Sequence, residues 1–230
     1  MNNIELAKKL SAKKAIEFVK EGMSIGLGTG TTTEYFIYGL SKLIAKEKIK
    51  IVGIPTSLNT EKLAKKLKIP ISTLDKYPEV DLCIDGADQI DFKFNMIKGG
   101  KGAHTREKII AKASKKYVVI VDYTKISRIL NREVPVEILN FSKGFVEKEL
   151  IKIGGTPKLR ENFITDNGCI ILDTKFKRID NAKKTELMIN SIPGVIENGI
   201  FSMRKPDIVI VGYPEKVEIL ERRYLKRNSK

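Results

Sequence analysis

The sequence predicts an α/β protein built from a mostly parallel sheet that helices cover on both faces, with a smaller α+β domain inserted late in the chain. Two observations predict this fold class. Over the first 130 residues, short apolar runs alternate with amphipathic segments, which is typical of parallel strands joined by helical crossovers. After residue 130 the predicted order of elements changes to β-α-β-β-α-β, the order of a ferredoxin-like domain.

The first part of the chain begins with a helix. Ile4, Ala7 and Leu10 recur at helical spacing, and the pattern continues to residue 20 before Gly22 ends it. Ser57 is a typical N-cap residue for a later helix. The other elements predicted here are strands over 23–27, 50–54, 69–73, 80–84 and 117–121, and helices that run from the turn at 28–32 to residue 46, from Ser57 to residue 66, and over 105–113.

The second part of the chain supplies the inserted domain and a final strand. The predicted strands cover 134–138, 156–160, 169–173 and 194–201, the helices cover 142–153 and 182–190, and a strand over 207–211 rejoins the first sheet. The predicted domains are therefore a Rossmann-like domain of residues 1–130 and 206–230, which carries the candidate site, and an inserted ferredoxin-like domain of residues 131–205.

The composition limits the classes of partner and the compartment. A net charge of +15 raises nucleic acid as a partner, but the lysines alternate with apolar residues as on solvated helix faces, so nucleic-acid binding is the lesser alternative. No apolar run approaches the roughly 20 residues that span a bilayer, and no secretory signal pattern is present. Cys83 and Cys169 lie in apolar strand-like settings, which favours buried reduced thiols. We expect a cytoplasmic protein with neither a membrane nor a nucleic acid as partner.

A glycine-rich turn over residues 26–32 predicts an anion site between the first strand and the next helix. Glycines let the backbone approach an anion, and the first amides of a helix can donate hydrogen bonds to it. The turn lacks the Lys-Ser/Thr pair of a Walker A loop, and Thr31 stands where a dinucleotide-binding turn has its third glycine. Phosphate binding is the favoured interpretation, and a tight turn without a ligand is the alternative.

Three aspartates at constant spacing follow the strand predicted over 80–84. Asp85, Asp88 and Asp91 could accept hydrogen bonds from sugar hydroxyls or bind a hard cation, although their run lacks the EF-hand pattern. Each residue alone could equally be a helix cap or a turn former.

Residues 98–107 combine three glycines, two lysines and a carboxylate at the start of a predicted helix. Lys98 could stabilise a developing oxyanion. Glu107 could act as a general base, because enclosure would raise its pKa from the reference value of about 4.3. Alternatively, Glu107 pairs with Arg106 or Lys108 on a solvated helix face. His104, the only histidine, is a weaker candidate for acid–base catalysis.

The candidate segments are expected to meet at one edge of the sheet. Residues 28–32, 85–88 and 122–125 each follow a predicted strand, and in parallel sheets ligands bind at the carboxyl ends of the strands. A base, an oxyanion stabiliser and an anion site in one place suit proton transfer on a phosphorylated metabolite.

Seven motifs follow one another along the chain. They are GLGTGTT at 26–32, IPTS at 54–57, DGAD at 85–88, KGGKGA at 98–103 with REK at 106–108, VD at 121–122 with Lys125, TDNG at 165–168 and IPGVIENG at 192–199. Each is weak alone, but together, in this order and spacing, they are highly specific. Through them the chain resembles the ribose-5-phosphate isomerase A family from about Leu6 to Val211.

The resemblance implies a metal-independent and cofactor-independent interconversion of ribose 5-phosphate and ribulose 5-phosphate through an enediolate, in the non-oxidative pentose phosphate pathway. By position, Glu107 matches the carboxylate that moves a proton between C1 and C2. Lys98 and Asp85 match groups that polarise the reacting oxygens or exchange protons with them. The family also implies a homodimer or homotetramer. The implied substrate contacts are Lys8, Thr29, Gly30, Thr31, Thr32, Asp85, Gly86, Ala87, Asp88, Lys98, Gly99, Gly100, Lys101 and Lys125.

Three residues depart from the family's usual pattern without removing a proposed catalytic group. Lys101 replaces a glycine, His104 replaces an apolar residue and Gln89 replaces a glutamate. Two other classes of protein stay open: a regulatory domain that senses sugar phosphates without turnover, and a coenzyme A transferase, which forms a thioester on a glutamate.

Overall fold

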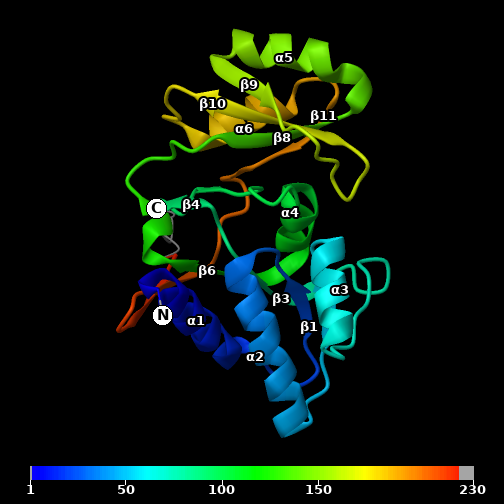
Figure 1. The fold of residues 1–230 in the computed structure, drawn as a ribbon, viewed down its shortest axis with the longest axis vertical. Helices are drawn as coiled ribbons and strands as arrows, with labels where there is room; N and C mark the ends of the chain where they lie inside the picture. The colour runs from blue at the N-terminus through cyan, green and yellow to red at the C-terminus, as the bar shows by residue number, and fades with distance from the viewer. Residues whose placement is uncertain (1, 223–230) are drawn as a thin grey trace, which may run out of the picture.

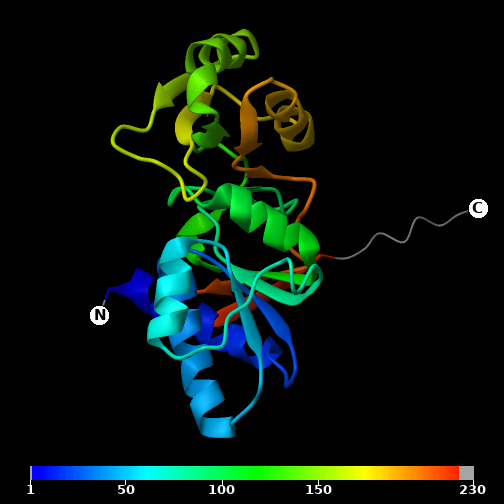
Figure 2. The ribbon, with the colours of Figure 1, turned by 90° about the vertical axis from the view of Figure 1, so that its right-hand side faces the viewer.

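The structure, a computed structural model, describes residues 2–222 and places two sheet-based halves one above the other along its long axis (Figure 1). The lower half holds the amino-terminal helices and a six-stranded sheet, and the upper half holds a four-stranded sheet with two helices. Helix α4 (His104–Ala113) lies at the junction between the two halves in both views (Figures 1 and 2). Residues 223–230, at the end of the first predicted domain, lie outside the described residues.

The six-stranded sheet is parallel except at one edge, where the last strand runs antiparallel to its neighbour. This confirms the predicted mostly parallel sheet and the return of the chain to it after the insertion. The last strand has no counterpart among the predicted elements. In spatial order the strands are β14 (Val217–Glu221), β13 (Ile208–Gly212), β6 (Ser114–Asp122), β3 (Val80–Asp85), β1 (Ser24–Leu27) and β2 (Val52–Pro55).

Helices cover both faces of this sheet, as predicted. Successive strand residues point to opposite faces, so Ile84 packs with Phe36 and Leu40 in one apolar cluster, while Cys83 packs with Ile110 of α4 in another. The helices on the first face are α1 (Asn3–Ala15), α2 (Thr31–Glu47) and α3 (Leu58–Lys66).

The upper half has the predicted ferredoxin-like element order, and all its neighbouring strands are antiparallel. Both of its helices share one apolar cluster with Val134, Val136 and Ile138, which leaves Glu137 on the opposite face, towards α4. The elements are β8 (Val134–Ile138), α5 (Lys143–Lys152), β9 (Gly155–Leu159), β10 (Ile170–Phe176), α6 (Ala182–Asn190) and β11 (Val195–Asn198), and the sheet order is β11-β8-β10-β9.

The prediction of one strand over 194–201 is wrong, because the chain changes sheets at Gly199. Its amide donates to the carbonyl of Pro135 at 2.8 Å, and a Cβ there would lie 2.3 Å from the carbonyl oxygen of Lys98. The residues after Gly199 join a small third sheet that lies outside the predicted elements. Its strands are β12 (Ile200–Phe201), β5 (Met96–Ile97), β4 (Gln89–Asp91) and β7 (Ile126–Ser127).

Two further element boundaries differ from the prediction. The expected strand over 69–73 is reduced to a single bridge between Gly53 and Ile71, and Pro70 within it has no amide to donate to a ladder. The first helix ends at Ala15 and continues as a short 3-10 turn over Ile16–Phe18.

Cys83 and Cys169 are both buried and form no disulfide, in agreement with the sequence. Among the described residues, no helix is long and apolar enough to cross a membrane. The limits of the two predicted domains stay a prediction.

Candidate active site

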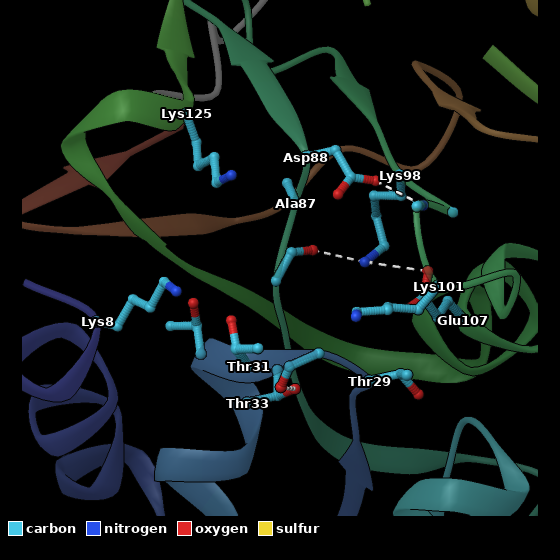
Figure 3. Close-up of a pocket in the computed structure, with 15 residues that line it drawn as sticks. Lys8, Thr29, Thr31, Thr33, Ala87, Asp88, Lys98, Lys101, Glu107 and Lys125 are labelled. Atoms are coloured by element: carbon cyan, nitrogen blue, oxygen red, sulfur yellow. Dashed lines mark hydrogen bonds and ion pairs between the residues drawn. The ribbon is translucent and has the colours of Figure 1, made fainter. Parts of the chain in front are cut away.

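A pocket of about 200 Å³ opens at the carboxyl ends of β1, β3 and β6. The three segments that follow these strands in the sequence meet there, as expected for a parallel sheet. Figure 3 shows Lys8 and Lys125 on one side of this pocket and Lys98, Lys101 and Glu107 on the other. The lining residues are Lys8, Thr29–Thr33, Gly86, Ala87, Asp88, Lys98, Gly99, Gly100, Lys101, Glu107 and Lys125.

The glycine-rich turn brings the start of α2 to the floor of the pocket. Gly30 adopts a φ of 127°, in the left-handed region that favours glycine, and the helix begins at Thr31. The first amides of a helix have no partner within it, and the helix dipole places partial positive charge there. Gly28 permits a second close approach, because a Cβ there would lie 2.2 Å from Oδ1 of Asp85.

Two lysines reach the same side of the pocket from separate elements. Lys8 comes from α1 and forms an ion pair with Glu5, with 2.7 Å between Nζ and Oε1. Lys125 comes from the 3-10 turn Tyr123–Lys125 that follows β6. Together with the start of α2, they give this side donors and positive charge suited to a phosphate group.

On the other side, the ammonium of Lys98 lies between two carboxylates. Nζ is 3.0 Å from Oδ2 of Asp85. It also lies 3.2 Å from Oε2 of Glu107 and donates to the carbonyl of Gly86 at 2.5 Å (Figure 3). All three charged residues are at most 3% exposed. Oδ1 of Asp85 accepts from the amides of Gly86 and Thr29 at 2.7 and 3.2 Å, which fixes this carboxylate beneath the pocket.

Burial and the charges of the three groups on one another set the pKa values of Asp85, Lys98 and Glu107. Burial, followed by the charge of Asp85, raises the pKa of Glu107 to about 8, although the Lys98 ammonium opposes the rise. Burial lowers the pKa of Lys98, but the two carboxylates outweigh it and the net pKa is raised, so this lysine stays cationic. Burial also raises the pKa of Asp85. A carboxyl whose pKa lies near neutrality can both accept and return a proton.

The glycine loop over 98–103 connects Lys98 to the helix that carries Glu107. Gly99 and Gly102 adopt φ of 100° and 76°, and the amide of Gly100 donates to Oδ2 of Asp88 at 2.8 Å. Lys101 points into the pocket from this loop (Figure 3). A chain with side chains at both left-handed positions would be strained, so the glycines allow the loop to wrap around the pocket.

The alternative in which Glu107 pairs with Arg106 or Lys108 on a solvated face is wrong. The Arg106 guanidinium instead donates to Oδ1 of Asn167 at 2.9 Å, and Lys108 forms ion pairs with two glutamates of the upper half. These neighbours therefore point towards the upper half, while Glu107 points into the pocket.

The structure separates His104, Asp91 and Gln89 from the pocket. His104 is buried, Nε2 lies 3.2 Å from the carbonyl oxygen of Glu197, and burial lowers its pKa to about 3. Asp91 accepts hydrogen bonds from the amides of Lys93 and Asn95, both at 2.8 Å. It therefore forms a turn, which was one of the alternatives for this residue.

Gln89 has a structural place as well, since it exchanges hydrogen bonds with Asn131. Within residues 2–222, no group of three histidine, cysteine, aspartate or glutamate side chains is arranged to hold a metal ion. All the residues predicted to contact the substrate line the pocket except Asp85, which lies beneath it. Thr33 also lines the pocket and was not among the predicted residues. Its position in the first turn of α2, beside Thr31 and Thr32, could have indicated it.

Comparisons with known proteins agree with this geometry. A sequence model described as ribose 5-phosphate isomerase A (phosphoriboisomerase A) matches residues 52–216. The chain is 44% identical to ribose-5-phosphate isomerase A of Methanococcus vannielii over 92% of this chain and 91% of the relative. It is also 44% identical to that of Pyrococcus abyssi over 96% and 100%, respectively.

Solved structures give the same result. Ribose 5-phosphate isomerase A from Methanocaldococcus jannaschii superposes with a TM-score of 0.90 at 41% identity, over 94% of this chain and 98% of that one. A D-ribose-5-phosphate isomerase in complex with phospho-erythronic acid superposes with a TM-score of 0.92 at 43% identity, over 96% of this chain and 100% of that one.

The fold and the pocket define an α/β enzyme of the sugar-phosphate isomerase class, with an ionisable carboxylate and a buried ammonium facing two lysines across the pocket. The extent of the sequence and structural matches makes the assignment specific. The chain belongs to the ribose 5-phosphate isomerase A family, which confirms the resemblance seen in the sequence.

Proposed function

We propose that this protein interconverts D-ribose 5-phosphate and D-ribulose 5-phosphate through an enediolate. The observation that carries the proposal is the Lys98 ammonium held 3.0 and 3.2 Å from two buried carboxylates, in a pocket whose other side is cationic. Aldose–ketose isomerisation needs a base beside the carbon that loses its proton, a cation for the developing oxyanion, and a fixed phosphate. Family membership favours this reaction over a sensor domain or a coenzyme A transferase.

In the proposed mechanism Glu107 takes the proton from C2 of the open-chain aldose. The electrons of the C2–H bond form the enediolate double bond, and negative charge develops on O1, where Lys98 stabilises it. Glu107 then returns the proton to C1, while the O2–H electrons form the C2 carbonyl and the O2 proton passes to the O1 oxyanion, which gives the ketose. Asp85 serves the proton exchange at the reacting oxygens. The raised pKa of Glu107 supports its role, because the same group must accept and then donate.

Substrate binding is proposed to use both sides of the pocket. The phosphate lies against the start of α2 and the two lysines that flank it, and the sugar hydroxyls lie along the loops after β3 and β5. The residues assigned to these contacts are Lys8, Thr29, Gly30, Thr31, Thr32, Asp85, Gly86, Ala87, Asp88, Lys98, Gly99, Gly100, Lys101 and Lys125. We further propose that the enzyme acts in the cytoplasm, in the non-oxidative pentose phosphate pathway, as a homodimer or homotetramer.

The test is to incubate the purified protein with ribose 5-phosphate in the presence and absence of EDTA and to follow ribulose 5-phosphate. We expect equal turnover in both conditions. Saturable sugar-phosphate binding without turnover would instead support the sensor class. A hydroxylamine-sensitive thioester formed with coenzyme A would support the transferase class.

A further inference from the structure

The upper half of the molecule contacts the glycine loop through one arginine. Arg160 directly follows β9, and its Nη1 donates to the carbonyls of Gly99 and Gly100 at 3.1 and 3.4 Å. The Gly99 carbonyl and the Gly100 amide belong to one peptide group, and this amide donates to Asp88. The loop backbone is therefore bound from both halves of the molecule.

The Arg160 guanidinium is itself fixed in orientation. It forms a two-point ion pair with Asp173 of β10, with 2.8 Å from Nε to Oδ2 and 2.5 Å from Nη2 to Oδ1. Its Cζ lies 5.3 Å from the ring centroid of Phe163. A two-point carboxylate contact leaves the remaining Nη1 donor aimed in one direction, here towards the loop.

Phe163 adds a second contact from the same segment. A Cβ at Gly102 would lie 2.2 Å from Cζ of Phe163, so the ring fills the space above the loop. Figure 2 shows the segment between β9 and β10, in yellow, descending from the upper sheet towards α4. The TDNG motif at 165–168 belongs to this segment, and its Asp166 accepts from the amide of Leu58 at the start of α3, at 2.8 Å.

The far end of the loop is held by the upper half as well. Thr105 donates to the buried Glu137 carboxylate, and Lys108 is 3.0 Å from Glu186 and 2.9 Å from Glu197. The residues flanking Glu107 are thus fixed independently of Arg160. Arg160 instead binds the loop backbone itself, at Gly99 and Gly100, opposite the contact from Asp88.

We propose that Arg160, oriented by Asp173, is a positioning residue that holds the glycine loop in the geometry required for isomerisation. Arg160 is not among the residues that line the pocket of Lys98 and Glu107, and its guanidinium binds the loop carbonyls and Asp173, so its proposed action is through the loop. The proposal rests on the proposed function, because it concerns the same reaction. A displacement of about 1 Å at a reacting group can cost on the order of 10²-fold in rate.

The test compares Arg160→Ala with Arg178→Ala. Arg178 pairs with Asp180 in the same half, but both side chains are at least 68% exposed, so this control removes an arginine without touching the loop. We expect Arg160→Ala to lower kcat by roughly 10-fold to 100-fold, with KM changed less than about threefold, and Arg178→Ala to match the wild type. Arg160→Lys is expected to recover little, because one ammonium cannot bind Asp173 at two points and also reach the loop.

Rescue by free guanidinium separates positioning from a general loss of structure. Millimolar guanidinium chloride should restore part of the kcat of Arg160→Ala, because Asp173 still offers its carboxylate. The double variant Arg160→Ala/Asp173→Asn should not respond. Wild-type kcat in Arg160→Ala, or a loss that guanidinium leaves unchanged, would overturn the positioning role. Absence of turnover in the wild type would overturn the proposed function and this inference with it.

Discussion

At one end of the pocket the Lys98 ammonium is enclosed between the carboxylates of Asp85 and Glu107, which are almost fully buried. Lys8 and Lys125, which lie at the other end (Figure 3), are partly exposed. The enclosed charges have strongly perturbed pKa values. In the proposed mechanism the buried end is where protons move, and burial there changes the affinity of Glu107 for its proton. The open end needs only positive charge and amide donors to bind a phosphate.

The comparison predicts its largest effect at Glu107. Glu107→Gln keeps the size and shape of the side chain but removes the base, so kcat should fall by about 10²–10⁴-fold. The Kd for inorganic phosphate should change little, because the open end is intact. Steady-state kinetics and calorimetric titration check the two parts. A variant with near wild-type kcat would show that another group takes the proton.

Lys98→Met tests the cation at the enclosed end. Loss of a charge that stabilises an oxyanion should lower kcat by about 10²–10³-fold. The exposed Lys115, which pairs with Asp81 near the opposite end of β3, supplies the matched control Lys115→Met. Equal kcat in the two variants would contradict the assignment of Lys98.

The pH profile sharpens the same contrast. The base works only when ionised, so kcat/KM of the wild type should rise with pH through an apparent pKa near 8, as Glu107 loses its proton. Lys98→Met should move this pKa upwards, because the cation that favours the carboxylate is gone. Lys125→Ala should leave it in place. An unchanged apparent pKa in Lys98→Met would show that a group other than Glu107 sets the pH dependence of kcat/KM.

At the open end, Lys125→Ala should act on binding. Removal of one cation from a phosphate site should raise KM by roughly tenfold, which corresponds to about 1.4 kcal/mol, with kcat nearly unchanged. Initial rates over a range of ribose 5-phosphate concentrations, beside Lys115→Ala, check this split. An unchanged KM would remove Lys125 from the phosphate site.

The smallest effect on activity is expected at His104, which is enclosed but lies outside the pocket. Its pKa falls to about 3 in the folded protein, so between about pH 3 and the unfolded value near 6.5 the unfolded chain binds more protons. Stability should therefore decrease as pH falls through this window. His104→Leu should weaken the dependence of stability on pH and keep kcat within about twofold. Urea unfolding at pH 4 and pH 7 measures the change in stability.

Much of the fold could be predicted because its elements carry local periodicity. The five parallel strands of the central sheet, and helices such as α3 and α6, carry apolar patterns that show within a few consecutive residues. The edge strand β14 was not predicted. The third sheet could not be predicted, because strands of two or three residues pair with partners far along the chain, such as Ile97 with Ile200. The break at Gly199 depends on the nearby Lys98 carbonyl, which no local pattern reveals.

The residues of the site likewise fall into those that the sequence could predict and those that it could not. The gathering of the loops after β1, β3 and β6 follows from parallel topology, so their residues could be named in advance. The partners of Arg106 and Lys108 could not, because both side chains bind the inserted half, whose orientation the sequence does not encode locally. For the same reason, the contacts of Arg160 and Thr105 between the two halves could not be predicted from the sequence.

The most direct test of the central claim follows the C2–H bond itself. Ribose 5-phosphate deuterated at C2 is incubated with the wild type and with Glu107→Gln, and NMR measures the loss of deuterium from C2. The account predicts loss with turnover in the wild type and loss slowed by at least about 10²-fold in the variant, while both bind inorganic phosphate. Loss at the wild-type rate in Glu107→Gln would contradict the assignment of the proton transfer to the enclosed end.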